Sequence, residues 1–172
     1  MARNRTEAKL RYAGVHLTEL VGTRRAGSDF DVAHQESFLF HLFGVRDSLL
    51  QEINIAHSCE IPIEKVSRPR IEKALNACES SSPALDEIRV LEDDPDSWLS
   101  CAAEMRHHSA HRTDVSRTYY KGGANNGAVH LHDVRIGQEI NVDFVDLFGQ
   151  WLDNMGQLVE RVRSKMPGAE DA

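Results

Sequence analysis

The C-terminal part of the chain carries the pattern that most limits its fold. Between residues 145 and 166, apolar side chains recur at alternating steps of three and four over three heptads. These positions are Val145, Phe148, Leu152, Met155, Val159, Val162 and Met166. The spacing places them on one stripe of an α-helix, and Asp143 is a possible N-cap. We predict a core helix of an antiparallel bundle, with dimerisation as the alternative role of the stripe.

Helical spacing also dominates the first half of the chain. Apolar residues at steps of three and four predict a first helix over residues 6–25 and a long second helix over residues 31–59. The second helix is apolar nearly all round through Phe40 and Phe43, which predicts a central position in the bundle. Pro69 suits the first turn of a short helix that ends at Ala77.

The middle of the chain predicts one further helix and a short insertion. Six acidic residues lie between Asp86 and Asp96, and we expect a solvated face followed by a helix over residues 95–112 with Asp94 as its N-cap. The glycine-rich residues 121–127 predict a loop. Alternating residues after it predict a hairpin or ordered loop near residues 122–142. The expected fold class is an all-α antiparallel helical bundle with this insertion.

Length and composition predict one soluble domain. A chain of 172 residues, 41% of them apolar, is long enough for one sizeable core and short for two. We expect a single helical domain over residues 1–172, with flexible ends at residues 1–5 and 167–172. No apolar run is long enough to span a bilayer, and no secretion signal precedes the first helix. Three well-separated cysteines predict reduced thiols and a cytoplasmic protein.

A basic and titratable cluster stands out against the acidic background. Arg106-His107-His108-Ser109-Ala110-His111-Arg112 holds three imidazoles and two guanidiniums, whereas the whole chain has a net charge of -7. From Arg106 to Lys121 there are four basic residues and one acid, Asp114. The net charge disfavours nonspecific binding of nucleic acid over the whole surface. The cluster therefore predicts a local site for an anionic ligand, an acidic partner surface or a metal.

The spacing inside this cluster resembles a known family motif. Arg106, the polar residue His107 directly after it, and His111 after four intervening residues are similar to the signature of HEPN domains. The apolar residues that precede the motif, from Trp98 to Met105, also resemble the helix that carries it in that family. The resemblance implies an all-α domain, and many such domains are metal-independent ribonucleases that act as dimers. It also implies a possible toxin or defence role with an antitoxin-type protein partner.

Metal-independent cleavage of RNA can be assigned to particular residues of the cluster. A histidine can transfer protons at neutral pH, so His111 and His107 are candidates for the proton on the 2′-hydroxyl and on the leaving oxygen. Arg106 would stabilise the charge that develops on the phosphate. Arg112 and Arg117 either contact substrate phosphates or complement the dipole at the end of the helix. The need for a 2′-hydroxyl restricts the reaction to RNA, and because the cleavage is metal-independent we expect no cofactor.

Helix geometry links this site to a homodimer. Residues five apart on an α-helix differ by about 140° around the axis and by about 7.5 Å along it, so Arg106 and His111 point in different directions. A single helix therefore cannot direct both side chains to one phosphate. Two copies related by a two-fold axis can place both residues around one cleft, because an isologous interface repeats the same patch.

Two other interpretations remain open at this stage. In the first, a noncatalytic HEPN-like module uses the same basic cluster to bind RNA, a nucleotide or an acidic protein. In the second, His107 and His111 are metal ligands of a DinB-type helical bundle, since residues four apart share a helix face. His130 with His132, or His41 or Asp47, would complete that metal site. The guanidiniums of Arg106, Arg112 and Arg117 disfavour a cation there.

Overall fold

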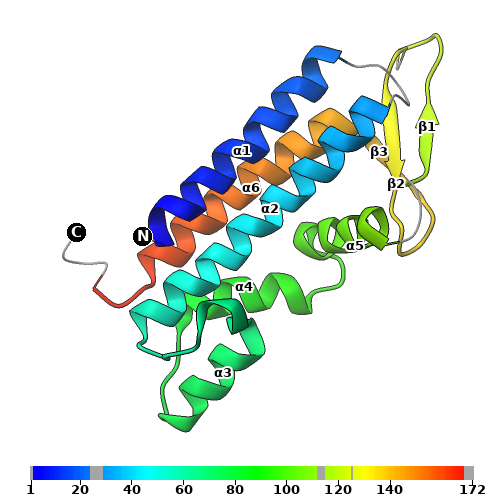
Figure 1. Cartoon of the computed structure of the whole chain (residues 1–172). Coiled ribbons are helices and arrows are strands. Elements are labelled where there is room, and N and C mark those ends of the chain that lie inside the picture. The colour runs from blue at the N-terminus through cyan, green and yellow to red at the C-terminus, as the bar shows by residue number, and fades with distance from the viewer. Residues whose placement is uncertain (1, 24–28, 112–114, 125, 169–172) are drawn as a thin grey trace.

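The protein is a bundle of helices with a small antiparallel sheet at one end (Figure 1). The computed structural model describes residues 2–23, 29–111, 115–124 and 126–168, with the side chains in these ranges except those of Ala2, Arg3, Thr23 and His111. The helices are α1 (Ala2–Thr23), α2 (Asp29–Ala56), α3 (Arg68–Ala77), α4 (Pro83–Asp93), α5 (Trp98–His111) and α6 (Phe144–Ser164), with a 3₁₀ turn at Ile63–Lys65. The predicted helical class is confirmed, and the sheet adds to it. None of the helices in the described ranges is long and apolar enough to cross a membrane.

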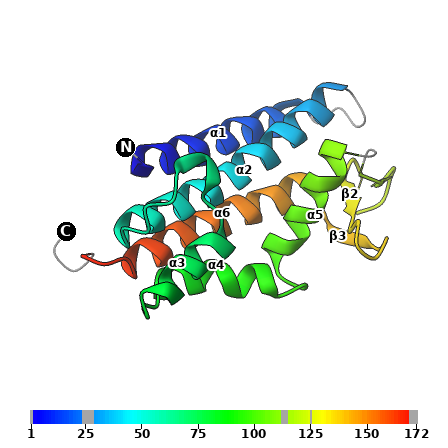
Figure 2. The ribbon, with the colours of Figure 1, turned by 60° about the horizontal axis from the view of Figure 1, so that its bottom comes forward.

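The long helices α1, α2 and α6 lie side by side, and α2 is the central element. It contacts α1 most extensively and also packs against α3, α4, α5 and α6. Figure 2 shows α1 on the opposite side of α2 and α6 from α3 and α4. The N-terminal end of α1 and the C-terminal end of α6 lie at the same end of the bundle, away from the sheet. α1 is therefore held mainly by α2, with fewer contacts to α6.

The core forms where the stripes of α2 and α6 meet. Phe38 and Phe148 stack with ring centroids 4.5 Å apart, and Trp151 stacks on Phe148 at 5.4 Å. The predicted stripe of α6 is buried at most of its positions, including Met155 and Val162. Burying large aromatic and aliphatic side chains provides most of the stabilisation of such a bundle. The sequence prediction for α6 is thus confirmed as a core helix.

The helix α4 was not predicted. The Ser82 hydroxyl accepts a hydrogen bond from the Leu85 backbone N–H at 3.2 Å, and Pro83 occupies the first turn. Leu85 and Ile88 then bury one face. The predicted solvated acidic face is correct only in part, because Glu87 pairs with Arg161 of α6 and Glu92 pairs with Arg46 of α2. α4 ends at Asp94, which is its C-cap.

The predicted start of the motif helix was wrong by a few residues. Because Asp94 ends α4, it does not cap α5, which begins at Trp98. Ser97 takes that role, since its hydroxyl accepts a hydrogen bond from the Ser100 backbone N–H at 3.0 Å. The first helix also begins earlier than predicted, at Ala2 rather than at residue 6.

The insertion after α5 is a three-stranded antiparallel sheet in the order β1-β2-β3. Its strands are β1 (Arg117–Tyr119), β2 (Val129–His132) and β3 (Glu139–Asp143). The hairpin of β2 and β3 agrees with the sequence prediction, whereas β1 was not predicted. Asp143 joins the sheet to α6, because its carboxylate accepts hydrogen bonds from the N–H groups of Val129 and Val145, both at 3.0 Å. The predicted N-cap role of Asp143 is confirmed.

Candidate functional site

Arg106 lies on α5, and its side chain contacts α2 and borders a cavity that α1 also lines. Its guanidinium carbon sits 5.3 Å from the ring centroid of Phe43, a buried residue of α2. This cation–π contact holds the guanidinium against the surface of α2. The same side chain borders a cavity of about 380 Å³ between α1 and α2. We call this the Arg106 cavity; its lining comprises Arg5, Ala8, Lys9, Tyr12, Phe40, Gly44, Asp47, Ser48, Gln51 and Arg106.

Two more cations enter the Arg106 cavity from α1. Arg5 and Lys9 are four residues apart, so they lie on one face of the helix. The Lys9 ammonium is 5.0 Å from the ring centroid of Phe40. Its aliphatic stem crosses α2 at Gly44, where a Cβ atom would approach Lys9 Cδ to 3.0 Å. Glycine at position 44 therefore leaves the room that Lys9 occupies.

The charge in the Arg106 cavity is positive and largely uncompensated. Asp47 is the one carboxylate among the described residues that line it, and it pairs with Arg46 at 2.7 Å. Within the described ranges, Arg5, Lys9 and Arg106 form no ion pair. Three cations that converge without a carboxylate partner favour an anionic ligand.

The Arg106 cavity is also lined by polar and aromatic side chains, which are not required for binding a simple anion. The Gln51 Oε1 atom is buried and has no hydrogen-bond partner among the described residues. Tyr12 and Phe40 border the same cavity and are 46% and 55% exposed. Their rings both contact His41, with centroid distances of 5.3 Å. The cavity therefore offers a hydrogen-bonding group and aromatic faces beside its cations.

His41 belongs to a cluster of imidazoles between α1 and α2. His16 stacks on His41 with ring centroids 5.3 Å apart, and its Nδ1 lies 3.0 Å from Nδ1 of His34. Partial burial lowers the pKa of His41, and Lys9 and His16 lower it further. The pKa of His16 is lowered by burial and by His34. Both rings therefore favour the neutral form.

His107, another predicted catalytic residue, is not among the described residues that line the Arg106 cavity. His107 is exposed, and successive helical residues differ by about 100°, so it faces away from the direction of Arg106. His111 is the last residue of α5, but its side chain lies outside the described part of the chain. Arg112 also lies outside the described residues. The pairing of Arg106 with His111 therefore stays a prediction.

Arg117, a predicted substrate contact, lies at a different place. It is the first residue of β1, not part of a helix end, and its Nη2 donates a hydrogen bond to Oε1 of Gln35 at 2.9 Å. Gln35 and Phe43 are separated by about 12 Å along α2 at 1.5 Å per residue. Arg117 and Arg106 thus reach α2 at separate points. The buried Nε of Arg117 has no hydrogen-bond partner among the described residues.

Two of the histidines considered as metal ligands, His130 and His132, are engaged in the sheet. His130 Nδ1 lies 2.7 Å from Glu139 Oε1, and His132 Nε2 lies 2.9 Å from the Thr118 hydroxyl. Hydrogen bonds from Tyr120 and His130 lower the pKa of Glu139. Among the described side chains, no three histidine, cysteine or acidic residues converge as a metal site would require. The His107–His111 pair is not tested by this, because the His111 side chain is not among them.

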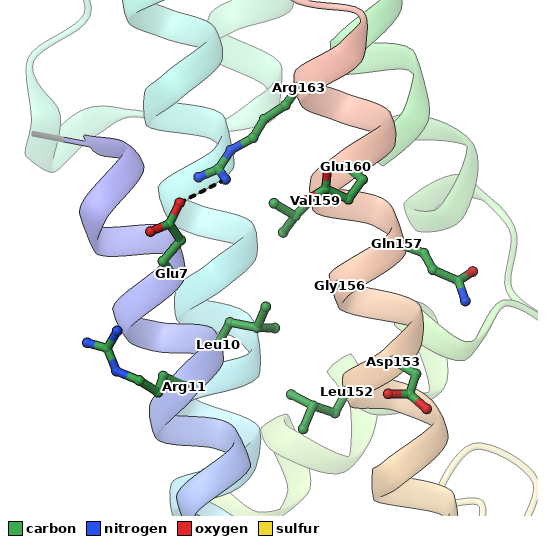
Figure 3. Close-up of a pocket in the computed structure, with 10 residues that line it drawn as sticks. All are labelled: Glu7, Leu10, Arg11, Leu152, Asp153, Gly156, Gln157, Val159, Glu160 and Arg163. Carbon is green, nitrogen blue, oxygen red and sulfur yellow. Dashed lines mark hydrogen bonds and ion pairs between the residues drawn. The ribbon is translucent and has the colours of Figure 1, made fainter.

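A second and larger cavity borders the other side of α1. Figure 3 shows this groove between α1 and α6, with Leu10 and Leu152 pointing toward the space between the helices. We call it the α1–α6 groove; its volume is about 780 Å³. Its rim carries the carboxylates of Glu7, Asp153 and Glu160 beside Arg11 and Arg163.

Arg163, a cation that lines the α1–α6 groove, is paired with carboxylates of two other helices. Arg163 donates to Glu52 from Nε and Nη2, both at 3.0 Å, and its Nη1 lies 3.3 Å from Glu7 Oε1 (Figure 3). Glu52 is buried and also accepts a hydrogen bond from the Thr6 hydroxyl at 2.5 Å. The hydrogen bond to Glu52 raises the pKa of Arg163. Arg11 remains as the one lining cation without an ion pair among the described residues, beside the carboxylates of Glu7, Asp153 and Glu160.

The sequence motif identified Arg106 and missed its neighbours. Arg5, Lys9 and Tyr12 recur at steps of four and three, so their shared face was readable from the sequence. The same holds for Phe40, Gly44 and Gln51 on α2. Nothing in the sequence showed that these two faces meet beside Arg106, because that depends on how α5 packs on α2.

No protein-family model, no curated protein and no solved structure matches the chain. The protein is thus defined by what it contains: a helical bundle with a small sheet, and a basic cavity flanked by aromatic side chains.

Proposed function

We propose that this protein is a HEPN-like, metal-independent ribonuclease that binds the RNA backbone in the Arg106 cavity. The observation that carries the proposal is the convergence of Arg106 with Arg5 and Lys9 in one cavity, without ion-pair partners for these three among the described residues. Guanidinium and ammonium groups are the side chains that bind phosphate oxygens best. The motif arginine is thus one of the residues available for a phosphate.

The roles of the motif residues follow from their chemistry. Arg106 stabilises the charge on the phosphate during cleavage, and His111 transfers the proton of the 2′-hydroxyl or of the leaving oxygen. His107 has a supporting role. Because Arg106 and His111 diverge on a single helix, we propose that a second copy of the chain completes the site.

The test is RNA cleavage by the purified full-length chain in the presence of EDTA. We expect cleavage by the wild type and loss of cleavage for Arg106→Ala and for His111→Ala, each with a circular dichroism spectrum like that of the wild type. Arg11→Ala is the control, since Arg11 lies on α1 like Arg5 and Lys9 but borders the α1–α6 groove and not the Arg106 cavity. Cleavage that survives in both motif variants, or that needs added metal, would contradict the proposal.

A noncatalytic RNA-binding module is the second candidate. The convergence of three cations in one cavity supports binding of an anion directly, whereas turnover requires His111 in addition. This candidate predicts RNA binding that weakens with salt and with Arg106→Ala, but no product under any condition. The same assay therefore separates the two candidates.

A further inference from the structure

Tyr12 on α1 and Phe40 on α2 both expose a large part of their aromatic side chains. Their exposed fractions are 46% and 55%, although Phe40 lies in the most apolar part of α2. Both side chains line the Arg106 cavity with the three cations. Aromatic faces beside a positively charged groove are the arrangement that binds single-stranded nucleic acid, because every unpaired base has a face that can stack.

We propose that Tyr12 and Phe40 form a stacking platform for an unpaired base, so that the ligand of the Arg106 cavity is single-stranded RNA. The proposal rests on the proposed function and adds the form of the RNA and the residues that recognise it. In a duplex the faces of each base are covered by neighbouring bases, and such a base cannot stack on a protein side chain. A cavity of about 380 Å³ also fits a nucleotide better than a helix of RNA.

His41 holds the platform in place. Its ring is tilted by 58° against Tyr12 and by 74° against Phe40, and it also stacks on His16. Each of the two exposed rings therefore has an aromatic contact with His41. A platform that is ordered before binding loses less conformational entropy when a base stacks on it.

The cations lie next to this platform along the same helices. Lys9 is three residues from Tyr12 on α1 and lies over the ring of Phe40. A nucleotide whose base stacks on Tyr12 or Phe40 would therefore carry its phosphate close to Lys9. Arg5, one turn before Lys9, and Arg106 from α5 are then available to further phosphates of the strand.

Gln51 supplies a polar contact at the edge of the same cavity. Its Oε1 atom is buried without a hydrogen-bond partner among the described residues, and such groups are rare unless a ligand or water pairs with them. A ribose 2′-hydroxyl or an exocyclic amine of a base can donate to this oxygen. The first of these would favour RNA over DNA.

The test is fluorescence anisotropy with a labelled single-stranded RNA of mixed sequence and with a blunt duplex of the same sequence. The full-length chain carries His111→Ala, so that the RNA is not consumed. Tyr12→Leu and Phe40→Leu remove the aromatic face, Tyr12→Phe keeps it, and Val15→Ala is an exposed control on α1. Thermal unfolding of each variant verifies that it is folded.

We expect each leucine variant to bind single-stranded RNA at least about fivefold more weakly, in line with the loss of one stacked base. Tyr12→Phe and Val15→Ala keep the wild-type affinity. The dependence of affinity on salt stays unchanged in the leucine variants, because no phosphate contact is lost. The duplex binds more weakly than the single strand.

Two other results would overturn the proposal in different ways. If single-stranded RNA binds but the leucine variants match the wild type, or the duplex binds equally well, the platform is wrong and the proposed function stands. If neither the wild type nor the His111→Ala chain binds any RNA at low salt, both the platform and the proposed function are wrong.

Discussion

The two cavities that flank α1 use the same kinds of charge in opposite ways. In the α1–α6 groove, Arg163 is held by Glu52 and Glu7, so the cation joins three helices of the bundle. In the Arg106 cavity, Lys9 and Arg106 lie over aromatic rings, and no ion pair engages them within the described ranges. Charges paired in the interior mainly hold the fold, whereas unpaired charges at a cavity are available to a ligand.

The larger cavity is thus the weaker candidate for a site that binds phosphate. The α1–α6 groove has about twice the volume, but its rim is dominated by carboxylates and its floor is apolar, with Leu10 and Leu152 facing each other. A phosphate would meet repulsion there. The difference shows that the pairing of charges, and not cavity size, distinguishes these two sites.

Removing Arg163 should have the largest effect, and it should act on stability. Arg163→Met leaves Glu52 buried without its cation, which we expect to lower the free energy of unfolding by about 3–5 kcal/mol. Urea unfolding followed by circular dichroism measures this, with the exposed Glu160→Gln as the control on the same groove. A loss below about 1 kcal/mol would mean that Arg163 is not a structural cation.

Reversing the charge on each side of α1 should separate the two cavities in binding. Lys9→Glu is expected to weaken binding of single-stranded RNA by about tenfold or more, as for a lost charged hydrogen bond. Arg11→Glu makes the same charge change on the other side of α1 and should weaken binding much less. The neutral variant Lys9→Gln should reduce the salt slope by about 0.7, the value for one phosphate contact on a single strand. Equal losses for the two reversed charges would show that only net charge matters.

The imidazole cluster beside the Arg106 cavity should make stability depend on pH. The pKa values of His16 and His41 are lowered in the folded state, so the unfolded chain binds more protons below its own histidine pKa of about 6.5. Their contribution is complete above that pH and is lost as the pH falls through the folded pKa values. We expect the urea midpoint to fall between pH 7.5 and pH 5.5, and to fall less in the His16→Gln/His41→Gln variant. An equal fall in both proteins would assign the pH dependence to other groups.

Two glycine substitutions compare the two cavities through the smallest change, the addition of one methyl group. Gly156→Ala in the α1–α6 groove meets no atom within 4 Å, and Gly44→Ala in the Arg106 cavity meets the stem of Lys9 at 3.0 Å. Each should gain up to about 1 kcal/mol from the higher helix propensity of alanine. Gly44→Ala should also shift Lys9 and weaken RNA binding slightly, whereas Gly156→Ala leaves binding unchanged. Thermal unfolding and anisotropy titrations measure both effects.

Local patterns in the sequence were enough for most helices and for the N-cap of α6. The stripe from Val145 to Val162 is periodic and buried, so periodicity and structure agree. α4 was not predicted because its apolar stripe, which includes Leu85 and Ile88, is short and lies among many acidic residues. Arg117 was misplaced because three residues of an edge strand carry too little pattern to be recognised.

The site was predictable only in part because it is built from three separate helices. Arg106 was found from its motif. Phe40 was expected in the core, because it is an apolar residue in an apolar part of the helix. The sequence does not indicate that the packing around it leaves the side chain exposed. The packing of the whole bundle determines which face of α1 contacts α2 and lies near α5. This information is not present in any local sequence pattern.

Photo-crosslinking tests the central claim most directly. Single-stranded RNA that contains a photoreactive uridine is bound to the full-length His111→Ala chain, irradiated and digested, and the linked peptides are identified by mass spectrometry. The account predicts crosslinks at Tyr12 and Phe40, with loss of signal in Lys9→Glu and not in Arg11→Glu. Crosslinks that concentrate on α6 between Leu152 and Val159, or on β1 near Arg117, would contradict it.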